Sequence, residues 1–561
     1  MSLNSTKYPN IIRTVKSGEY PVMPDDSVIL VDTTFDTSSI LHTTTLDLNT
    51  IPANYWDTQY KLYVSDIGNS AATYPITILA PTGFLINGAQ TITINVNNGG
   101  VLIRILNNTN YIAEYSYGGG SDYLNSIPVA NTVFIMKNGN DDTGLVERFD
   151  KPFLTFAGAR AAIQSYLSPH DTNRIMVRVY SGDYNETIVL DPYVDFDLGD
   201  ITLTQILDSS GDIAMITDYG NFADSIIQGE AEIVMNVTDT DSANNYFGVL
   251  IVGNSSKVIL NCKSITCTET ATIPAREQAP SISGVYLSSN ATLSLNCENI
   301  TCTNAHGVVY GIEADKAGII YANVKQTLTT TGGLFAQYGI RSYDTTTIIY
   351  NGDTILTNNE DTTGLAGSIV SVFSQAGGTA IVRCNKITQT SPGGKSCAIF
   401  CGQATATIYC SYITSTATTI GRMSCIYYSG RSDSQPTNLY VECIQTTMNC
   451  LAENQSVIFA SSGNNRDRAI FKGRYVCIDS GDSGLNLTSI VLQSDPTVAT
   501  ILDGVTLIGT NSGYSIYSST GTGGEVWIYG SVQTNVNYDT SINLLVGTVF
   551  NGRFLVDGAT I

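Results

Sequence analysis

Two stretches of the chain match almost letter for letter at a fixed offset, and this repeat restricts the fold more than any other feature. KVILNCKSITC (residues 257–267) and TLSLNCENITC (residues 292–302) lie 35 residues apart. Weaker copies of the same strand pattern continue downstream. Their intervals run from 26 to 35 residues, which is typical of a solenoid with strands of constant length and turns of variable length. The counterparts of Cys262 in these copies are Cys297, Asn323, Gly352, Cys384, Cys410, Cys443, Gly473, Gly504 and Gly530.

Each unit contains short runs of β-branched residues separated by Gly, Asn, Ser or Asp, so one coil holds two or three short strands. Units of about 30 residues are short for a four-stranded propeller blade of about 40–50. The repeat therefore predicts a right-handed parallel β-helix. With coils about 4.8 Å apart, the ~13 coils that fit between about residue 176 and the end form a rod of roughly 60 Å.

All twelve cysteines lie between Cys262 and Cys477, and none forms a C-x-x-C pair. Their spacing follows the repeat, so we expect buried, reduced thiols stacked in a ladder from coil to coil. Disulfides between coils are the alternative. A metal site is disfavoured because His306 is the only histidine in the array, and the sequence indicates no cofactor.

Upstream of the coils, residues 133–144 predict a strand and a polar turn, residues 148–156 a turn with a proline, and residues 157–163 a short amphipathic helix. Residues 175–188 predict a strand followed by a turn. This order resembles the entry module of pectate-lyase-like β-helices, in which a short helix caps the open end of the stack. The resemblance implies the fold and no particular activity. A cap covers the unpaired backbone groups of a solenoid end.

The amino-terminal region has a different pattern of short strands separated by turns, which predicts a small all-β sandwich or barrel. The expected strands are residues 28–32, 43–48, 60–66, 75–79, 83–88, 91–95, 100–105 and 111–115. The predicted organisation is an amino-terminal arm at 1–24, an all-β module at 25–120, a linker and entry cap at 121–190, and the β-helix at 191–561.

The segment DIGNSAATYPITI (residues 66–78), followed by GFLING (residues 83–88) and a Thr-Ile-Asn strand, resembles a module in structural proteins of tailed bacteriophages and some large DNA viruses. Joined to a β-helix, it is similar to a virion fibre or tailspike. The resemblance implies a homotrimer whose amino-terminal module attaches to other virion proteins. It also implies location in the virion, after assembly in the host cytoplasm.

Charge narrows the choice of partner. The formal net charge is −22, with 27 Lys and Arg against 49 Asp and Glu. Nucleic-acid binding depends on basic residues that displace counterions from phosphates, so nucleic acid and anionic membrane surfaces are disfavoured. The first residues lack a basic and then apolar signal, and no apolar run is long enough to span a bilayer, so we expect neither export by a signal peptide nor membrane insertion.

Candidates for catalysis are carboxylates, because three histidines leave little for imidazole chemistry. Aligning YGIEADK (residues 310–316) with YGIRSYD (residues 338–344) places Glu313, Asp315 and Asp344 near one edge of neighbouring coils. Glycoside hydrolysis needs two carboxyl groups about 5–5.5 Å apart for retention or about 6.5–9.5 Å apart for inversion, and adjacent coils can supply the shorter distance. The alternative is solvated turn residues, which are common in a chain this acidic.

Candidates for glycan binding are tyrosines, since sugars bind to exposed aromatic faces. We name Tyr409, Tyr412, Tyr427 and Tyr428, and cross-strand packing is their alternative role.

These observations favour a structural virion fibre or tailspike that attaches to a host-surface glycan or receptor. A polysaccharide depolymerase, hydrolase or lyase, on the same scaffold is the first alternative, although an enzyme is the less favoured reading. A passive head or capsid decoration fibre without a ligand is the second.

Overall fold

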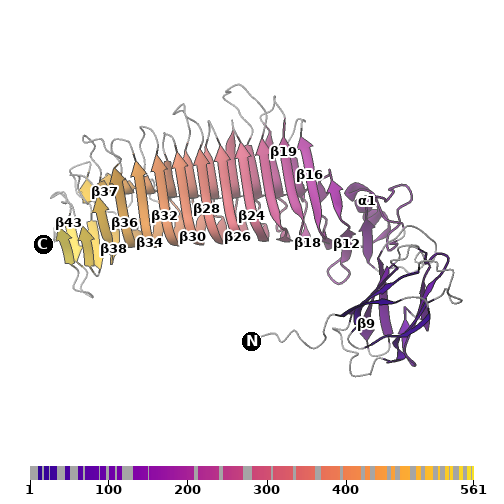
Figure 1. Ribbon diagram of the computed structural model, residues 1–561. Helices are drawn as coiled ribbons and strands as arrows, with labels where there is room; N and C mark the ends of the chain where they lie inside the picture. The colour runs from indigo at the N-terminus through magenta and orange to yellow at the C-terminus, as the bar shows by residue number, and fades with distance from the viewer. Residues whose placement is uncertain are drawn as a thin grey trace. The chain divides into compact units, whose positions relative to one another are not determined.

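The computed structural model divides into two compact units, Met1–Pro128 and Val129–Ile561 (Figure 1). The structure describes residues 11–15, 18–23, 26–33, 44–50, 61–66, 70–87, 89–95, 100–107, 110–116, 131–149, 151–207, 213–238, 244–269, 281–304, 307–332, 336–359, 368–391, 396–417, 424–429, 436–450, 456–461, 468–479, 488–493, 499–509, 516–518, 525–529, 531–534, 543–546, 553–556 and 559–560.

The first unit consists of two sheets around one apolar core, and the chain alternates between the sheets. One sheet has the order β1-β3-β5-β9-β10-β7 and the other β2-β4-β6-β8. The strands are β1 (Ile11–Val15), β2 (Gly18–Pro21), β3 (Asp26–Val31), β4 (Thr44–Asp47), β5 (Lys61–Asp66), β6 (Ile76–Leu79), β7 (Leu85–Ile86), β8 (Thr91–Ile94), β9 (Gly100–Asn107) and β10 (Asn110–Ser116), with a 3₁₀ turn at Leu48–Thr50.

All eight strands expected in this unit are present, which confirms the all-β module. Strands β1 and β2 lie in the segment interpreted as an arm, and they pair in parallel with β3 and β4. Strands β3 and β5 are also parallel, as are β4 and β6, whereas β8 and β9 pair antiparallel with β6 and β5. The chain therefore first winds alternately through the two sheets, with parallel pairing between successive strands of each sheet. Strands β8 and β9 then add to the two sheets with antiparallel pairing.

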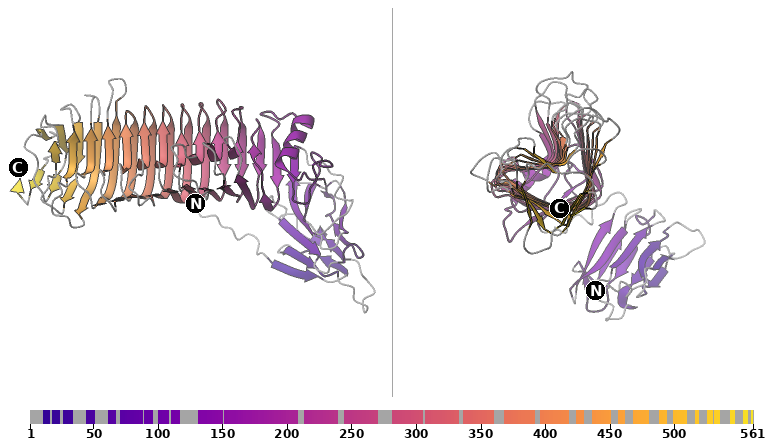
Figure 2. Two further views of the ribbon diagram at one scale, coloured as in Figure 1. Left: turned by 90° about the horizontal axis from the view of Figure 1, so that it is seen from above. Right: turned by 90° about the vertical axis from the view of Figure 1, so that its left-hand side faces the viewer.

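The second unit is the predicted right-handed parallel β-helix, and its coils have three faces (Figure 2). A 23-stranded sheet forms two of them, and a 12-stranded sheet with one strand per coil forms the third. The third face comprises β14 (Ile188–Val189), β17 (Ile213–Thr217), β20 (Asn245–Ile251), β23 (Ser281–Leu287), β25 (Val308–Ala314), β27 (Gln337–Tyr343), β29 (Ile369–Gln375), β31 (Ser396–Gly402), β33 (Ser424–Ser429), β35 (Ser456–Ser461), β37 (Thr488–Gln493) and β40 (Ile516–Ser518).

In the middle of the stack each strand of the large sheet continues round a corner from the first face to the second. These strands are β24 (Thr292–Asn304), β26 (Ile319–Gly332), β28 (Thr347–Asn359), β30 (Thr379–Ser391), β32 (Thr405–Ala417), β34 (Asn438–Cys450) and β36 (Arg468–Asp479). Near the ends the two faces are separate strands. They are β11 (Thr132–Ile135), β12 (Ile175–Val179), β13 (Gly182–Tyr184), β15 (Val194–Asp197), β16 (Ile201–Leu207), β18 (Asp224–Gln228), β19 (Glu232–Val237), β21 (Lys257–Asn261), β22 (Ser264–Glu269), β38 (Ala499–Asp503), β39 (Thr506–Gly509), β41 (Glu525–Tyr529), β42 (Ser531–Thr534), β43 (Asn543–Val546), β44 (Arg553–Val556) and β45 (Ala559–Thr560).

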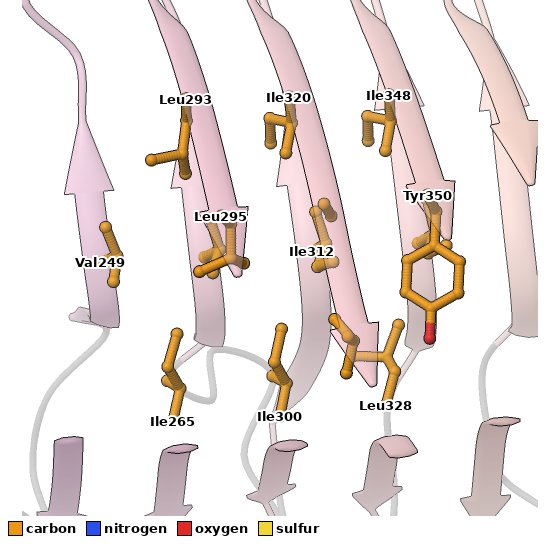
Figure 3. Close-up of a cluster of buried hydrophobic side chains, with 14 of the residues drawn as sticks. Val249, Ile265, Leu293, Leu295, Ile300, Ile312, Ile320, Leu328, Ile348 and Tyr350 are labelled. Carbon is orange, nitrogen blue, oxygen red and sulfur yellow. The ribbon is translucent and has the colours of Figure 1, made fainter. Parts of the chain in front are cut away.

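Identical positions on successive coils form rows of buried side chains along the interior. On the first face Leu293, Ile320 and Ile348 lie opposite one another, and on the second face Ile300 lies opposite Leu328 (Figure 3). Side chains alternate inward and outward along each strand, so the intervening residues face outward. The alternation of β-branched and polar letters in the repeat thus produces one continuous core.

The corner between the first and second faces carries the predicted ladder, with one correction. Cys384, Cys410 and Cys443 lie in register as expected. Cys297, however, lies opposite Val324 and not opposite Asn323. Asn323 belongs to the neighbouring row, in which it lies opposite Asn296.

Ten cysteines have described side chains; they are free thiols, and all but the half-buried Cys384 are buried. Cys267 lies opposite Cys302, and the sulfur atoms of Cys384 and Cys410 are 3.6 Å apart. These positions confirm buried, unbridged ladder residues. Burial raises the pKa of the Cys397 thiol, which keeps it protonated and unreactive at neutral pH.

Helix α1 (Phe156–Tyr166) confirms the expected helix at the entry to the coils. The Thr155 hydroxyl accepts a hydrogen bond from the Gly158 N–H and caps the helix. Phe156 and Ile163 are buried with the interior of the first coils. The helix thus covers the apolar end of the stack.

Candidate functional site

Glu313 lies on the outer side of the third face, in a layer that neighbouring side chains cover. It sits on β25 between Tyr286 of β23 and Arg341 of β27. The residue is 5% exposed, its carboxylate forms an ion pair with Arg341, and the Ser283 hydroxyl donates a hydrogen bond to it at 3.3 Å. The predicted alignment of these two coils is correct, since Tyr310 lies opposite Tyr338.

Tyrosine rings surround the Arg341 guanidinium. Its Cζ atom lies 5.4 Å from the ring centroid of Tyr310, 5.9 Å from that of Tyr338 and 5.0 Å from that of Tyr343, within the range of cation–π attraction. Burial raises the pKa of Glu313, and the charge and hydrogen bond of Arg341 oppose that rise. The carboxylate therefore has a permanent cationic partner.

The other two predicted carboxylates lie in turns. Asp315 is half-buried just after β25, and Asp344 is exposed just after β27, with a positive φ of 49°. The Asp344 carbonyl accepts a hydrogen bond from the Ala317 N–H at 3.1 Å, which joins the two turns. Hydrolysis requires two carboxyl groups that both reach the substrate. Glu313 is shielded and neutralised, so this trio is better suited to stabilising adjacent coils.

The four predicted tyrosines do not form one groove. Tyr428 on β33 is fully buried and faces the interior of the β-helix, whereas Tyr427 beside it faces outward. Tyr409 and Tyr412 lie on β32 at the corner between the first and second faces, and they are 39% and 48% exposed. Only Tyr409 and Tyr412 of the four share an accessible surface.

Tyr427 belongs to a row of stacked rings on the third face, here named the aromatic stripe: Phe373, Phe400, Tyr427 and Phe459. Successive ring centroids are 4.8, 5.3 and 5.0 Å apart, with interplanar angles of 11°, 9° and 6°. Each inner ring thus has its faces covered by its neighbours, and the faces are not free for a sugar. The sequence reasoning missed this stripe, although an aromatic residue recurs at one position of the strands IVSVFSQ, SCAIFCG, SCIYYS and SVIFAS.

The exposed tyrosines belong to a second cluster, here named the corner patch: Arg383, Lys386, Tyr409, Tyr412 and Arg474. Arg383 lies opposite Tyr409, with its Cζ 5.6 Å from the ring centroid, and Lys386 lies opposite Tyr412. Arg474 continues the row of Tyr412 two coils further on. The three basic residues are exposed.

Tyr440 of the next coil adjoins this patch. Its ring lies 5.5 Å from that of Tyr409 at an interplanar angle of 51°, and Lys472 Nζ lies 5.7 Å from the Tyr440 ring. These rings are tilted and not stacked, so part of the Tyr409 surface remains accessible. The corner patch offers exposed aromatic surface beside cationic groups, the combination that binds saccharides and acidic groups.

Within the described ranges no set of three or more His, Cys, Asp or Glu side chains is placed to hold a metal ion. His306 lies outside the described residues. In the same described part, no helix is long and apolar enough to cross a membrane.

The fold and the surface together define a parallel β-helix protein with an aromatic and basic patch at one corner. No family model, no curated protein and no solved structure matches the chain.

Proposed function

We propose that this protein is an attachment fibre, in which the β-helix is a rigid support for a glycan-binding surface at the corner patch. The observation that carries the proposal is the exposure of Tyr409 and Tyr412 beside Arg383 and Lys386 on adjacent coils. Aromatic rings contribute much contact area for little lost conformational entropy, because they have few rotatable bonds.

The support is stiff, which favours binding by reducing the ordering that a ligand must impose. Strands β30, β32, β34 and β36 pair in parallel beneath the patch, with one register shift between β34 and β36 at the corner. The side chains therefore project from a hydrogen-bonded surface and not from a loop.

The resemblance of residues 66–88 to virion modules supports placing this fibre on a virus particle. In this proposal the amino-terminal unit binds other virion proteins, the chain assembles as a homotrimer, and the corner patch meets the host-surface glycan. Light scattering of the native protein tests the trimer, because a mass near that of one 60.1 kDa chain contradicts it.

Depolymerisation is the weaker candidate, because Glu313 is shielded by side chains and paired with Arg341. We expect incubation with a bound polysaccharide to release no oligosaccharides. Release that is lost in Glu313→Gln would overturn this preference.

Binding of the purified protein to an array of bacterial surface polysaccharides tests the proposal. Tyr409→Ala/Tyr412→Ala is expected to weaken binding at least tenfold. Tyr321→Ala is the matched control, since Tyr321 is 46% exposed on β26 outside the patch, and it should leave binding unchanged. Binding that survives the double substitution, or no binding to any glycan, contradicts the proposal.

A further inference from the structure

We propose that the ligand of the corner patch is an acidic polysaccharide, bound through carboxylate or phosphate groups and aligned with the long axis of the β-helix. This inference rests on the proposed function and specifies its ligand. The unusual feature is a local excess of positive charge on a strongly acidic chain.

The whole chain has 27 basic and 49 acidic side chains. Two outward rows flank the corner from β30 to β36, and these rows reverse that balance. They contain Arg383, Lys386, Lys472 and Arg474, against Glu442 alone. Such a concentration of one sign creates a local potential that attracts the opposite charge.

Three of these cations have no carboxylate partner in the described part of the chain. Among the described residues, no carboxylate forms an ion pair with Arg383, Lys386 or Arg474, whereas Lys472 pairs with Asp503 at 3.1 Å. A different cation at the same corner, Lys263 directly after Cys262, is paired with Glu232 at 2.6 Å. The patch cations are thus available to an external anion.

The arrangement also sets the direction of the ligand. Adjacent coils are about 4.8 Å apart, so the basic residues of β30 and those of β36 lie roughly 14 Å apart along the axis. Tyr409 and Tyr412 lie on the coil after Arg383 and Lys386. A polysaccharide that runs along the axis can contact the basic residues of β30 at one end and those of β36 at the other. The rings of Tyr409 and Tyr412 lie between these two ends.

Carboxylates and phosphates suit these donors. A guanidinium presents a planar fork that donates two parallel hydrogen bonds to either group, and charge-assisted bonds are about twice as strong as neutral ones. A neutral polymer has no group that compensates the exposed cations. Acidic repeats are therefore preferred over neutral ones.

The test measures binding of the full chain to three probes: alginate as a carboxylated polysaccharide, dextran as a neutral one, and inorganic polyphosphate as an anion without sugar rings. Arg383→Gln/Lys386→Gln is expected to weaken alginate binding at least tenfold, with a smaller salt dependence. Lys257→Gln/Lys263→Gln removes the same charge outside the patch and should change binding less than twofold. Circular dichroism of each variant verifies the fold.

The outcomes separate the two proposals. In one outcome, dextran binds as tightly as alginate, and binding is lost in Tyr409→Ala/Tyr412→Ala but kept in Arg383→Gln/Lys386→Gln. This result supports glycan attachment and overturns the preference for acidic glycans. Polyphosphate binding as tight as alginate binding, with no effect of the tyrosine substitutions, shows attraction by charge alone and overturns the inference. Failure to bind any array glycan or probe overturns both.

Discussion

Replacing Arg341 by Met tests whether the ion pair with Glu313 holds neighbouring coils together. Met keeps much of the apolar stem but removes the charge, which leaves a carboxylate that is 5% exposed without its partner. Breaking a buried pair by removing one member costs about 3–5 kcal/mol. Unfolding entropy is about 2.1 cal/mol/K per residue, or ~0.9 kcal/mol/K for the roughly 430 residues of the second unit. If that unit unfolds cooperatively, its thermal midpoint falls by about 3–6 °C.

The stability lost in Arg341→Met should be larger at high pH than at low pH. Burial raises the pKa of Glu313 above its ordinary value of 4.5, and Arg341 opposes the rise. Without Arg341 the folded-state pKa rises further, so the folded protein retains its proton at a pH where the unfolded chain has released it. The penalty is therefore present above the folded-state pKa and disappears as the pH falls to about 4.5.

Thermal unfolding followed by circular dichroism at pH 4.5 and pH 8 measures this effect, with wild type compared at each pH so that common titrations cancel. Glu313→Gln/Arg341→Met removes both charges and should recover most of the stability lost at pH 8. An equal loss at both pH values refutes the reasoning. So does a double variant that is as unstable as Arg341→Met.

Three further predictions follow from the packing. Gly473→Ala should lower the free energy of unfolding by about 2 kcal/mol or more, because Gly473 has a φ of +113° and an added Cβ would lie 1.8 Å from the Cys443 carbonyl oxygen. Urea denaturation measures this loss, and an unchanged midpoint contradicts the prediction. Phe400→Ala should cost about 2–4 kcal/mol because it interrupts the aromatic stripe, whereas Phe400→Tyr should cost less than about 1.5 kcal/mol; similar losses would show that ring stacking is unimportant. Thr155→Ala should cost about 1 kcal/mol through the lost helix cap, measured by hydrogen exchange in α1, and unchanged exchange there argues against the cap.

The strands could be predicted because their signals are local. Alternation with a period of two and turn residues at fixed places identified all eight expected strands of the first unit and the coil pattern of the second. The amphipathic pattern of residues 157–163 likewise indicated α1. The alternation between two sheets in the first unit could not be predicted, because the choice of pairing partner depends on long-range contacts and not on the strand letters.

The candidate site was predicted less well. Tyr427 and Tyr428 were grouped by residue type, although adjacent strand residues face opposite sides, and only Tyr427 points outward. Asn323 was placed in the row of Cys297, although it lies opposite Asn296, because its copy of the repeat contains no cysteine to fix the alignment.

The repeated sequence by itself determined that this chain forms a parallel β-helix, because one inward and outward pattern recurs on every coil and has a single way to bury its apolar side. Only the tertiary structure decided that Glu313 is shielded and that Tyr409 and Tyr412 are accessible. All three occupy outward positions, and an outward position is alike in sequence whether neighbouring side chains cover it or not. The environment of an outward residue is made by side chains on the neighbouring coils. The packing between coils therefore decides whether such a residue is covered, as Glu313 is, or accessible, as Tyr409 and Tyr412 are.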